Sequence, residues 1–185
     1  MVSQLKVNEI IKQSGSSISI GESGTTVSIP SGATFNVAGS SVTAVDNTPY
    51  FIAGKGGSQT SVSDNAYTQV TYVTEVADSG DNYASSTFTA PSAGKYFFSA
   101  NVTISPNSGN AIQTVLQFYK NGSGLDDYRA TLITEGMEIA QQQLVISGLI
   151  SLAASDTVKV YAKMNTDSGN ATFADGQFSG FKIIG

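Results

Sequence analysis

The chain has 185 residues and a net charge of −5, which is enough for one sizeable domain and a small extra segment. It contains no cysteine and no histidine, which excludes disulfides, Cys/His zinc sites and His-based catalytic triads. Hydrophobic residues make up 40% and charged residues only 12%, and no cluster of Lys and Arg offsets the acidic balance, so we expect no nucleic-acid partner and no membrane insertion.

Residues 1–13 form a short segment whose apolar side chains cannot be buried within it. These side chains are Leu5, Val7, Ile10 and Ile11. We interpret the segment as an anchor that docks on a partner chain; the alternative is a frayed tail. It lacks the apolar run of a signal peptide, and together with the missing cysteines this favours assembly in a reducing cytoplasm.

Residues 14–49 contain three apolar pairs, separated by turns rich in Gly, Ser or Pro, and a linker. The pairs recur about every eight or nine residues, a unit too small to bury its apolar face alone. Three chains wrapped about one axis would gather three copies of each apolar residue, so we predict a trimeric β-stalk; the alternative is a meander within one chain. The stalk core would be Ile18, Ile20, Val27, Ile29, Phe35 and Val37.

Residues 50–185 contain many short strand-like runs separated by Gly, Asn, Asp and Ser, which favours an all-β sandwich or jelly roll. We predict strands near 50–53, 67–76, 84–90, 95–104, 112–120, 129–134, 143–152, 157–164 and 177–184. Residues 135–142 fit either a helical turn or a bulged strand. Residues 123–128 and 165–176 are predicted to be exposed loops.

Residues 86–99 consist of two strand-like arms around Pro91 and Gly94. Pro91 removes a ladder donor and Gly94 permits a positive φ, so the chain must turn between the arms. The simplest interpretation is a β-hairpin. Alternation would place Phe88, Ala90, Tyr96 and Phe98 on one side of the pleat, and Thr87, Thr89 and Phe97 on the other.

Several motifs follow one another through this head in a fixed order. They are Phe51-Ile-Ala53, Tyr83, Phe88-Thr-Ala-Pro-x-x-Gly94-x-Tyr96-x-Phe98, Leu116-x-Phe118-x-Lys120-Asn-Gly122, Leu152-Ala-Ala-Ser-Asp156-x-Val158 and Phe178-Ser-Gly180-Phe181. The set resembles the globular head of complement component 1q and its relatives, with Ser155 in place of the usual glycine and residues 123–143 departing from the pattern. The resemblance implies a jelly roll like that of tumour necrosis factor. Its signature core would be Phe88, Pro91, Gly94, Tyr96, Phe98 and Phe181.

The N-terminal segments resemble a different group of proteins. Gln4-Leu-Lys-Val-Asn-Glu-Ile-Ile11 and Ile29-Pro-Ser-Gly-Ala-Thr-Phe35 are similar to the stalks of bacteriophage tail fibres. This resemblance implies a virion protein that is assembled in the host cytoplasm and is extracellular in the mature particle. Its N-terminus would dock on another phage structural protein, and its head would contact a host cell-surface glycan or protein.

Four acidic pairs are candidates for chemistry: Asp78 with Asp81, Asp126 with Asp127, Glu135 with Glu138, and Asp167 with Asp175. Paired carboxylates can hydrolyse glycosides, but these lie in segments that read as exposed loops, so we predict no enzyme, no catalytic residue and no cofactor. Calcium is the one metal that the oxygen-rich stretch 78–82 would suit; the alternative is a solvated turn.

Tyrosines are the candidate sugar-contacting residues, because the chain has no tryptophan. Tyr83, Tyr119 and Tyr128 lie near predicted strand ends or loops, where stacking on a sugar, ordinary packing and contact within a trimer are all open. We take Tyr128, Asp126 and Asp127 as the candidate receptor contacts, since loops on a rigid sandwich commonly carry recognition.

Together with the two resemblances, these observations lead us to expect a homotrimeric tail fibre. Attachment of its jelly-roll head to the host surface, through avidity, is what the resemblance implies. The first alternative is a capsid decoration protein or head fibre seated on the shell. A polysaccharide-degrading enzyme and a secreted cellular module are the others, and the missing signal peptide and cysteines oppose the last.

Overall fold

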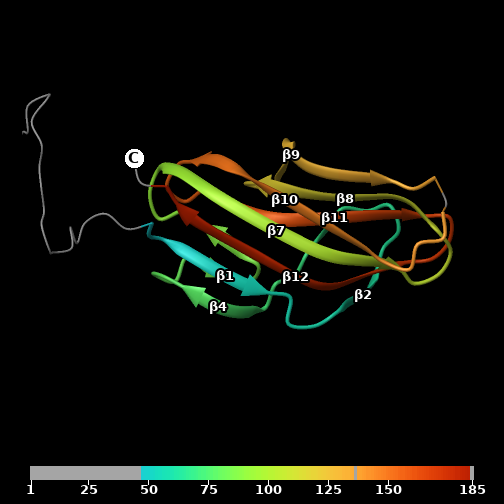
Figure 1. The fold of residues 1–185 in the computed structure, drawn as a ribbon. Coiled ribbons are helices and arrows are strands. Elements are labelled where there is room, and N and C mark those ends of the chain that lie inside the picture. Colours follow the sequence, from blue (N-terminus) through green and yellow to red (C-terminus); the bar gives the residue numbers. More distant parts are fainter. Residues whose placement is uncertain (1–46, 136, 184–185) are drawn as a thin grey trace, which may run out of the picture. The chain divides into compact units, whose positions relative to one another are not determined.

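The computed structural model describes residues 47–135 and 137–183, and its regular structure there consists of β-strands (Figure 1). The strands are β1 (Tyr50–Gly54), β2 (Gln59–Val62), β3 (Thr68–Gln69), β4 (Thr74–Asp78), β5 (Tyr83–Ala84), β6 (Thr87–Thr89), β7 (Gly94–Pro106), β8 (Ala111–Lys120), β9 (Ser123–Ile133), β10 (Gln142–Leu152), β11 (Thr157–Thr166) and β12 (Ala171–Lys182). The predicted anchor residues Leu5, Val7, Ile10 and Ile11 and stalk residues Ile18, Ile20, Val27, Ile29, Phe35 and Val37 lie outside the described residues.

The strands form two six-stranded sheets in which every pairing is antiparallel. Sheet A has the order β10-β7-β12-β1-β4, with β2 also paired to β12. Sheet B has the order β5-β6-β11-β8-β9, with β3 also paired to β11. The two sheets pack face to face as a sandwich, which confirms the predicted all-β jelly-roll class.

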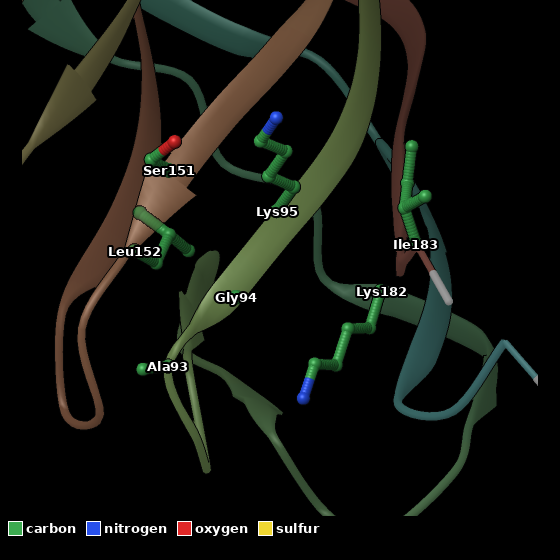
Figure 2. Close-up of a pocket in the computed structure, with 7 residues that line it drawn as sticks. All are labelled: Ala93, Gly94, Lys95, Ser151, Leu152, Lys182 and Ile183. Atoms are coloured by element: carbon green, nitrogen blue, oxygen red, sulfur yellow. The ribbon is translucent and has the colours of Figure 1, made fainter. Parts of the chain in front are cut away.

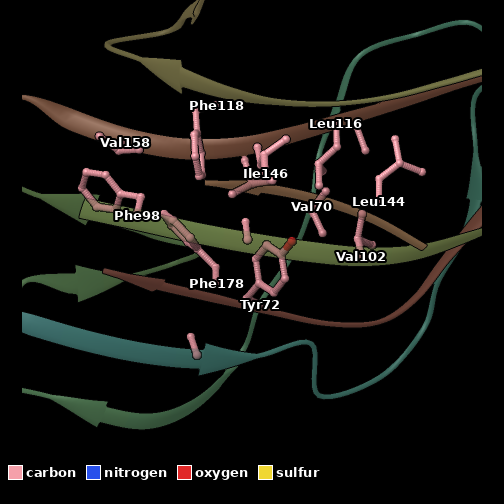
Figure 3. Packing of buried hydrophobic residues seen from close by; sticks show 14 of the residues in the cluster. Val70, Tyr72, Phe98, Val102, Leu116, Phe118, Leu144, Ile146, Val158 and Phe178 are labelled. Atoms are coloured by element: carbon pink, nitrogen blue, oxygen red, sulfur yellow. The ribbon is translucent and has the colours of Figure 1, made fainter. Parts of the chain in front are cut away.

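Aromatic side chains from both sheets fill the space between them (Figure 3). The Phe51 ring in β1 stacks on Tyr83 at 4.7 Å between centroids and meets the edge of Phe178 at 4.8 Å. The ring centroid of Phe178 in turn lies 6.1 Å from that of Phe118 in sheet B. Each aromatic residue buries 150–250 Å² in typical cores, so this cluster supplies much of the hydrophobic stabilisation of the sandwich.

The signature residues do not all belong to this core. Phe88, Tyr96 and Phe98 are fully buried, as alternation requires. Pro91 is exposed and Gly94 is half-buried where β7 begins. Phe181 is half-buried on the opposite face of sheet A, because it directly follows the inward-facing Gly180 in β12. The core interpretation of Pro91, Gly94 and Phe181 is therefore corrected.

Gly180 explains why a glycine stands in the closing Phe-x-Gly motif. A Cβ at this position would lie 2.5 Å from Cδ1 of Phe98 and 3.0 Å from Cε1 of Phe51. Both atoms belong to rings held in the packed core, which cannot retreat without losing contacts. The motif therefore records a close approach between β12 and the aromatic cluster.

The predicted hairpin at residues 86–99 is wrong, because its two arms belong to different sheets. β6 pairs with β5 and β11 in sheet B, whereas β7 pairs with β10 and β12 in sheet A. The chain crosses between the sheets at Ala90, whose backbone N–H donates to the carbonyl of Asp156 at 2.9 Å and whose carbonyl accepts from the N–H of Ser155 at 2.7 Å. The predicted inward and outward faces are nevertheless correct.

Two segments predicted to be exposed loops are wholly or largely strand, and only residues 167–170 of the second form a loop. Residues 123–128 belong to β9, which the Asn121-Gly122 turn joins to β8. Residues 165–176 contain the end of β11 and the start of β12, with buried Ala171 and Phe173. Conversely, the predicted strand 67–76 is divided between β3 and β4, 84–90 is interrupted at Ser85 and Ser86, and β2 was not predicted. The described residues between β9 and β10 form neither a helix nor a strand.

The Lys-Asn-Gly and Leu-x-x-Ser-Asp motifs meet at one end of sheet B. Lys120 forms an ion pair with Asp156 at 2.9 Å, and the side-chain amide of Asn121 donates to the other Asp156 oxygen at 2.8 Å. The backbone N–H of Ala153 also donates to Asp156. Ser155, which replaces the glycine usual in the resembled family, has a φ of 69°, a left-handed conformation that favours glycine.

Asp156 makes the stability of the head sensitive to acid. Its hydrogen bonds from Asn121 and Lys120 lower its pKa to about 2, from an ordinary value of 3.8. The native state thus favours the charged carboxylate, and its contribution to the free energy of unfolding is present above pH 4 and is lost as the pH falls toward 2.

We expect Asp156→Asn to reduce the loss of stability between pH 5 and pH 2, because the variant has no carboxylate to protonate. Urea unfolding midpoints measured across this pH range test the change. Parallel profiles for the variant and the parent chain would contradict this assignment.

Candidate functional site

The outer face of sheet A carries an apolar row that crosses four strands. Backbone register aligns Leu149 of β10 with Phe97 of β7, Phe97 with Phe181 of β12, and Phe181 with Tyr50 of β1. The rings of Phe97 and Phe181 are 5.5 Å apart. Leu149 is 51% exposed and Tyr50 is 45% exposed, so the row is open to solvent at both ends. We call these four residues the apolar row.

The two neighbouring rows consist of uncharged side chains, several of them small. The next row aligns Ser147, Ser99 and Ser179 with Ile52, and the row beyond it aligns Val145, Asn101 and Gln177 with Gly54. No Lys, Arg, Asp or Glu stands in these three rows across β10, β7, β12 and β1. Alternation places the row residues on the face opposite the core.

This arrangement suits the burial of the face against another protein surface. Large side chains at the apolar row would be removed from water. The serine row would allow the two backbones to approach closely without burying an unpaired charge. The signal for the face was present in the sequence: Tyr96-Phe-Phe98 and Leu144-Val-Ile146 are continuous apolar runs, which are typical of strands covered on both faces. The sequence interpretation assigned one face of Tyr96-Phe-Phe98 to the core and assigned no face to Leu144-Val-Ile146.

The three predicted receptor-contact residues lie on a widened part of β9 next to β8. Four β9 residues stand opposite the single residue Phe118 there. Asp126 accepts hydrogen bonds from Gln117 at 3.1 Å and from Arg129 at 3.0 Å. Tyr128 turns toward β10, where its hydroxyl donates to the carbonyl of Leu149 and its ring covers Gly148. Asp127 is exposed beside the shallow groove between β9 and β10.

Tyr128 is therefore a packing residue that holds the two edge strands together. Its ring belongs to the layer packed against the core, and a Cβ on Gly148 would lie only 2.3 Å from that ring. Tyr83 is likewise structural: its hydroxyl donates to the carbonyl of Tyr72 at 2.8 Å, and burial raises its pKa to about 12. Tyr119 differs, because it stands on the outer face of sheet B.

In two of the acidic pairs, one carboxylate accepts a hydrogen bond from a backbone N–H of a neighbouring segment. Asp78 accepts from the backbone N–H of Tyr83 at 2.8 Å, and Asp167 accepts from the backbone N–H of Asn110 at 2.8 Å. Calcium takes six to eight oxygen ligands, and no group of three or more acidic side chains in the described residues could hold a metal ion. One oxygen of Asp78, Oδ1, is buried without a hydrogen-bond partner among those residues, which is far short of such a site.

A pocket opens at the end of sheet A beside the apolar row (Figure 2). It is lined by Ala93, Gly94, Lys95, Ser151, Leu152, Lys182 and Ile183. The two lysine side chains point away from each other, and Lys182 Nζ donates to the Ser92 hydroxyl at 2.9 Å. The lysines therefore do not converge on a common ligand position. The described residues contain no helix that is long and apolar enough to cross a membrane.

Comparison with known proteins gives a match at the level of three-dimensional structure. Neither protein-family models nor curated protein sequences give a match. Among solved structures, the chain is similar to the globular domain of the zebrafish complement 1qA protein, with a TM-score of 0.51 and 17% sequence identity over 74% of this chain and 98% of that chain. This likeness supports the jelly-roll fold.

Removal of the Tyr128 hydroxyl tests its structural role. We expect Tyr128→Phe to lower the free energy of unfolding by about 0.5–1.5 kcal/mol, because the Leu149 carbonyl loses its donor. Urea unfolding measures the change. Tyr67→Phe is the matched control, since the hydroxyl of Tyr67 has no partner among the described residues, and it should leave the midpoint unchanged. Equal midpoints for both variants would show that the Tyr128 bond does not contribute.

Proposed function

We propose that the chain is a non-enzymatic structural protein, the jelly-roll head and stalk of a homotrimeric bacteriophage tail fibre that attaches to the host surface. The observation that carries the assembly part of this proposal is the apolar row of Leu149, Phe97, Phe181 and Tyr50 on the outer face of sheet A. A face of this kind is unfavourable in water for an isolated head and favourable once covered by a second copy.

The energetics support assembly through this face. Full burial of one Leu or Phe side chain contributes about 1.5–3 kcal/mol, and each copy in a closed ring would bring the same row. The serine and Asn/Gln rows beside it add little cost, because neutral polar groups can be paired or left at the rim. Folding and assembly would then be linked, with the stability of the head rising with concentration.

The number of copies and the virion setting rest on the sequence. Three apolar pairs in residues 14–49 suit three chains about one axis, and the segments 4–11 and 29–35 resemble phage fibre stalks. Docking of residues 1–13 on another phage structural protein would fix one end of the rod. Three weak sites held at the other end would gain avidity for a multivalent host surface.

Charge substitution in the apolar row tests the assembly interface. We expect the full chain to sediment with three times the mass of a 19.1 kDa protomer, and Leu149→Glu with Tyr50→Glu to shift it toward smaller species. Buried carboxylates without partners are costly, whereas both positions tolerate charge in a monomer. The matched control is Val73→Glu, an exposed apolar residue outside the three rows.

Sedimentation equilibrium separates the possible results. An unchanged trimer in the row variant would contradict the proposed interface. If replacement of Ile18, Ile20, Val27 and Ile29 by Ser alone gives monomers, the stalk is the dominant contact. A parent chain that is monomeric at all concentrations would overturn the trimer itself.

Localisation on intact particles tests the virion part of the proposal. We expect gold-labelled antibody against residues 50–185 to mark the tail in electron micrographs, because the fibre head is distal and accessible. Gold over the shell would contradict the tail-fibre assignment in favour of a decoration protein or head fibre. Particles without gold, under conditions in which the purified chain is labelled, would overturn the virion assignment.

A further inference from the structure

The outer face of sheet B differs in chemistry from the outer face of sheet A. Along β11, alternation places Lys159, Tyr161 and Lys163 on this face, at half-buried positions. Register aligns Lys159 directly with Tyr119 of β8, and Tyr161 with Gln117. The face of sheet A that carries the apolar row has no charge in its central rows, whereas this face has two cations on one strand.

Three tyrosines gather on this face from separate segments of the chain. The Tyr119 ring stacks on Tyr161 at 4.0 Å between centroids and lies 6.0 Å from the ring of Tyr67. The Lys163 ammonium lies over the Tyr67 ring, 5.3 Å from its centroid. We call Tyr67, Tyr119, Tyr161, Lys159 and Lys163 the tyrosine–lysine patch.

The hydroxyl groups of the patch tyrosines have no hydrogen-bond partner among the described residues. By contrast, Tyr72, Tyr83, Tyr96 and Tyr128 each donate a hydroxyl hydrogen bond to a backbone carbonyl. Those tyrosines stabilise the fold through both ring and hydroxyl. The patch tyrosines keep their hydroxyls available. Burial, followed by the nearby Tyr67, Tyr161 and Asp126, raises the pKa of Tyr119.

The lysines of the patch are not neutralised by carboxylates. In the part of the chain that the structure describes, ion pairs join Lys120 to Asp156 and Arg129 to Asp126, and neither Lys159 nor Lys163 takes part in one. Asp126, the carboxylate that acts on Tyr119, already accepts from Arg129 and from Gln117. A chain with net charge −5 therefore carries a locally positive, aromatic surface.

We propose that the tyrosine–lysine patch is a binding site for an acidic saccharide, a glycan whose sugar rings carry carboxylates. Tyrosine rings offer apolar surface to the C–H faces of a sugar, and free phenol hydroxyls can hydrogen-bond sugar hydroxyls. Lys159 and Lys163 provide complementary charge on either side of Tyr161. The proposal rests on the proposed attachment function for its biological role, and names the host-surface chemistry that the head would recognise.

The position of the patch agrees with such a role. The two sheets have their inner faces against a common core, so the outer face of sheet B points away from the outer face of sheet A (Figure 1). Assembly through the apolar row would leave the patch exposed on every copy. Each copy would then present one site outward, as avidity requires.

Calorimetric titration of the full chain with trigalacturonate tests this site without depending on avidity, because the probe is short. We expect saturable binding, and little binding of the fully methyl-esterified trisaccharide, which keeps the sugar but lacks the charge. Lys159→Gln with Lys163→Gln should weaken binding roughly tenfold. Lys95→Gln with Lys182→Gln is the matched control, with the same change of net charge on sheet A, and should bind like the parent chain.

Each other outcome overturns a defined part of the proposal. Absence of binding would contradict the proposed site. Equal binding of the esterified probe would show that charge is not recognised, and equal binding of a short polyglutamate peptide would show that the sugar is not recognised. Equal weakening by the control variant removes the location. Sedimentation of the same samples shows whether the apolar-row assembly persists, so failure of the patch is distinguished from failure of the proposed function.

Discussion

The aromatic cluster between the sheets decides what each outer face presents. Strand side chains alternate strictly, so a strand held in register by Phe51, Phe98 and Phe178 has every other residue fixed outward. A slip by one residue would bring Phe97 and Phe181 into the core and expose Phe98 and Phe178. The close approach of Gly180 to the Phe98 ring, where no Cβ fits, is one of the contacts that opposes such a slip.

Two different surfaces follow from that constraint. The outward residues of sheet A form the apolar row, flanked by uncharged rows, and this chemistry favours burial against a like surface. The outward residues of sheet B place lysines and unbonded tyrosine hydroxyls together, and this chemistry favours a polar, acidic ligand. Because the surfaces lie on opposite sides of one sandwich, self-association and ligand binding need not compete. The head can thus be part of a rigid assembly and still present its sites outward.

Sequence patterns predicted the fold class and the inward faces well, because alternation and the ordered motifs are local signals. They misplaced the pairing of residues 86–99, since nothing local shows that the chain changes sheet at Ala90. The polar stretches 123–128 and 165–176 were predicted to be loops, yet residues 123–128 lie within β9, and residues 165–166 and 171–176 belong to β11 and β12. Tyr67, Tyr119 and Tyr161 come from three distant segments, so no spacing could have revealed their cluster. The apolar row could have been predicted, because Tyr96-Phe-Phe98 lacks the alternating polar residue expected of a strand with one face in water.

Hydroxyl-radical footprinting of the full chain is the measurement that most directly tests whether one outer face is covered and the other is free. In the isolated protomer Tyr50 is 45% exposed and Tyr67 is 38% exposed, so the two rings form an internal comparison. If sheet A is the interface, Tyr50 should be strongly protected while Tyr67 is oxidised as in an exposed side chain. Equal oxidation of the two tyrosines at assembly concentrations would contradict the account.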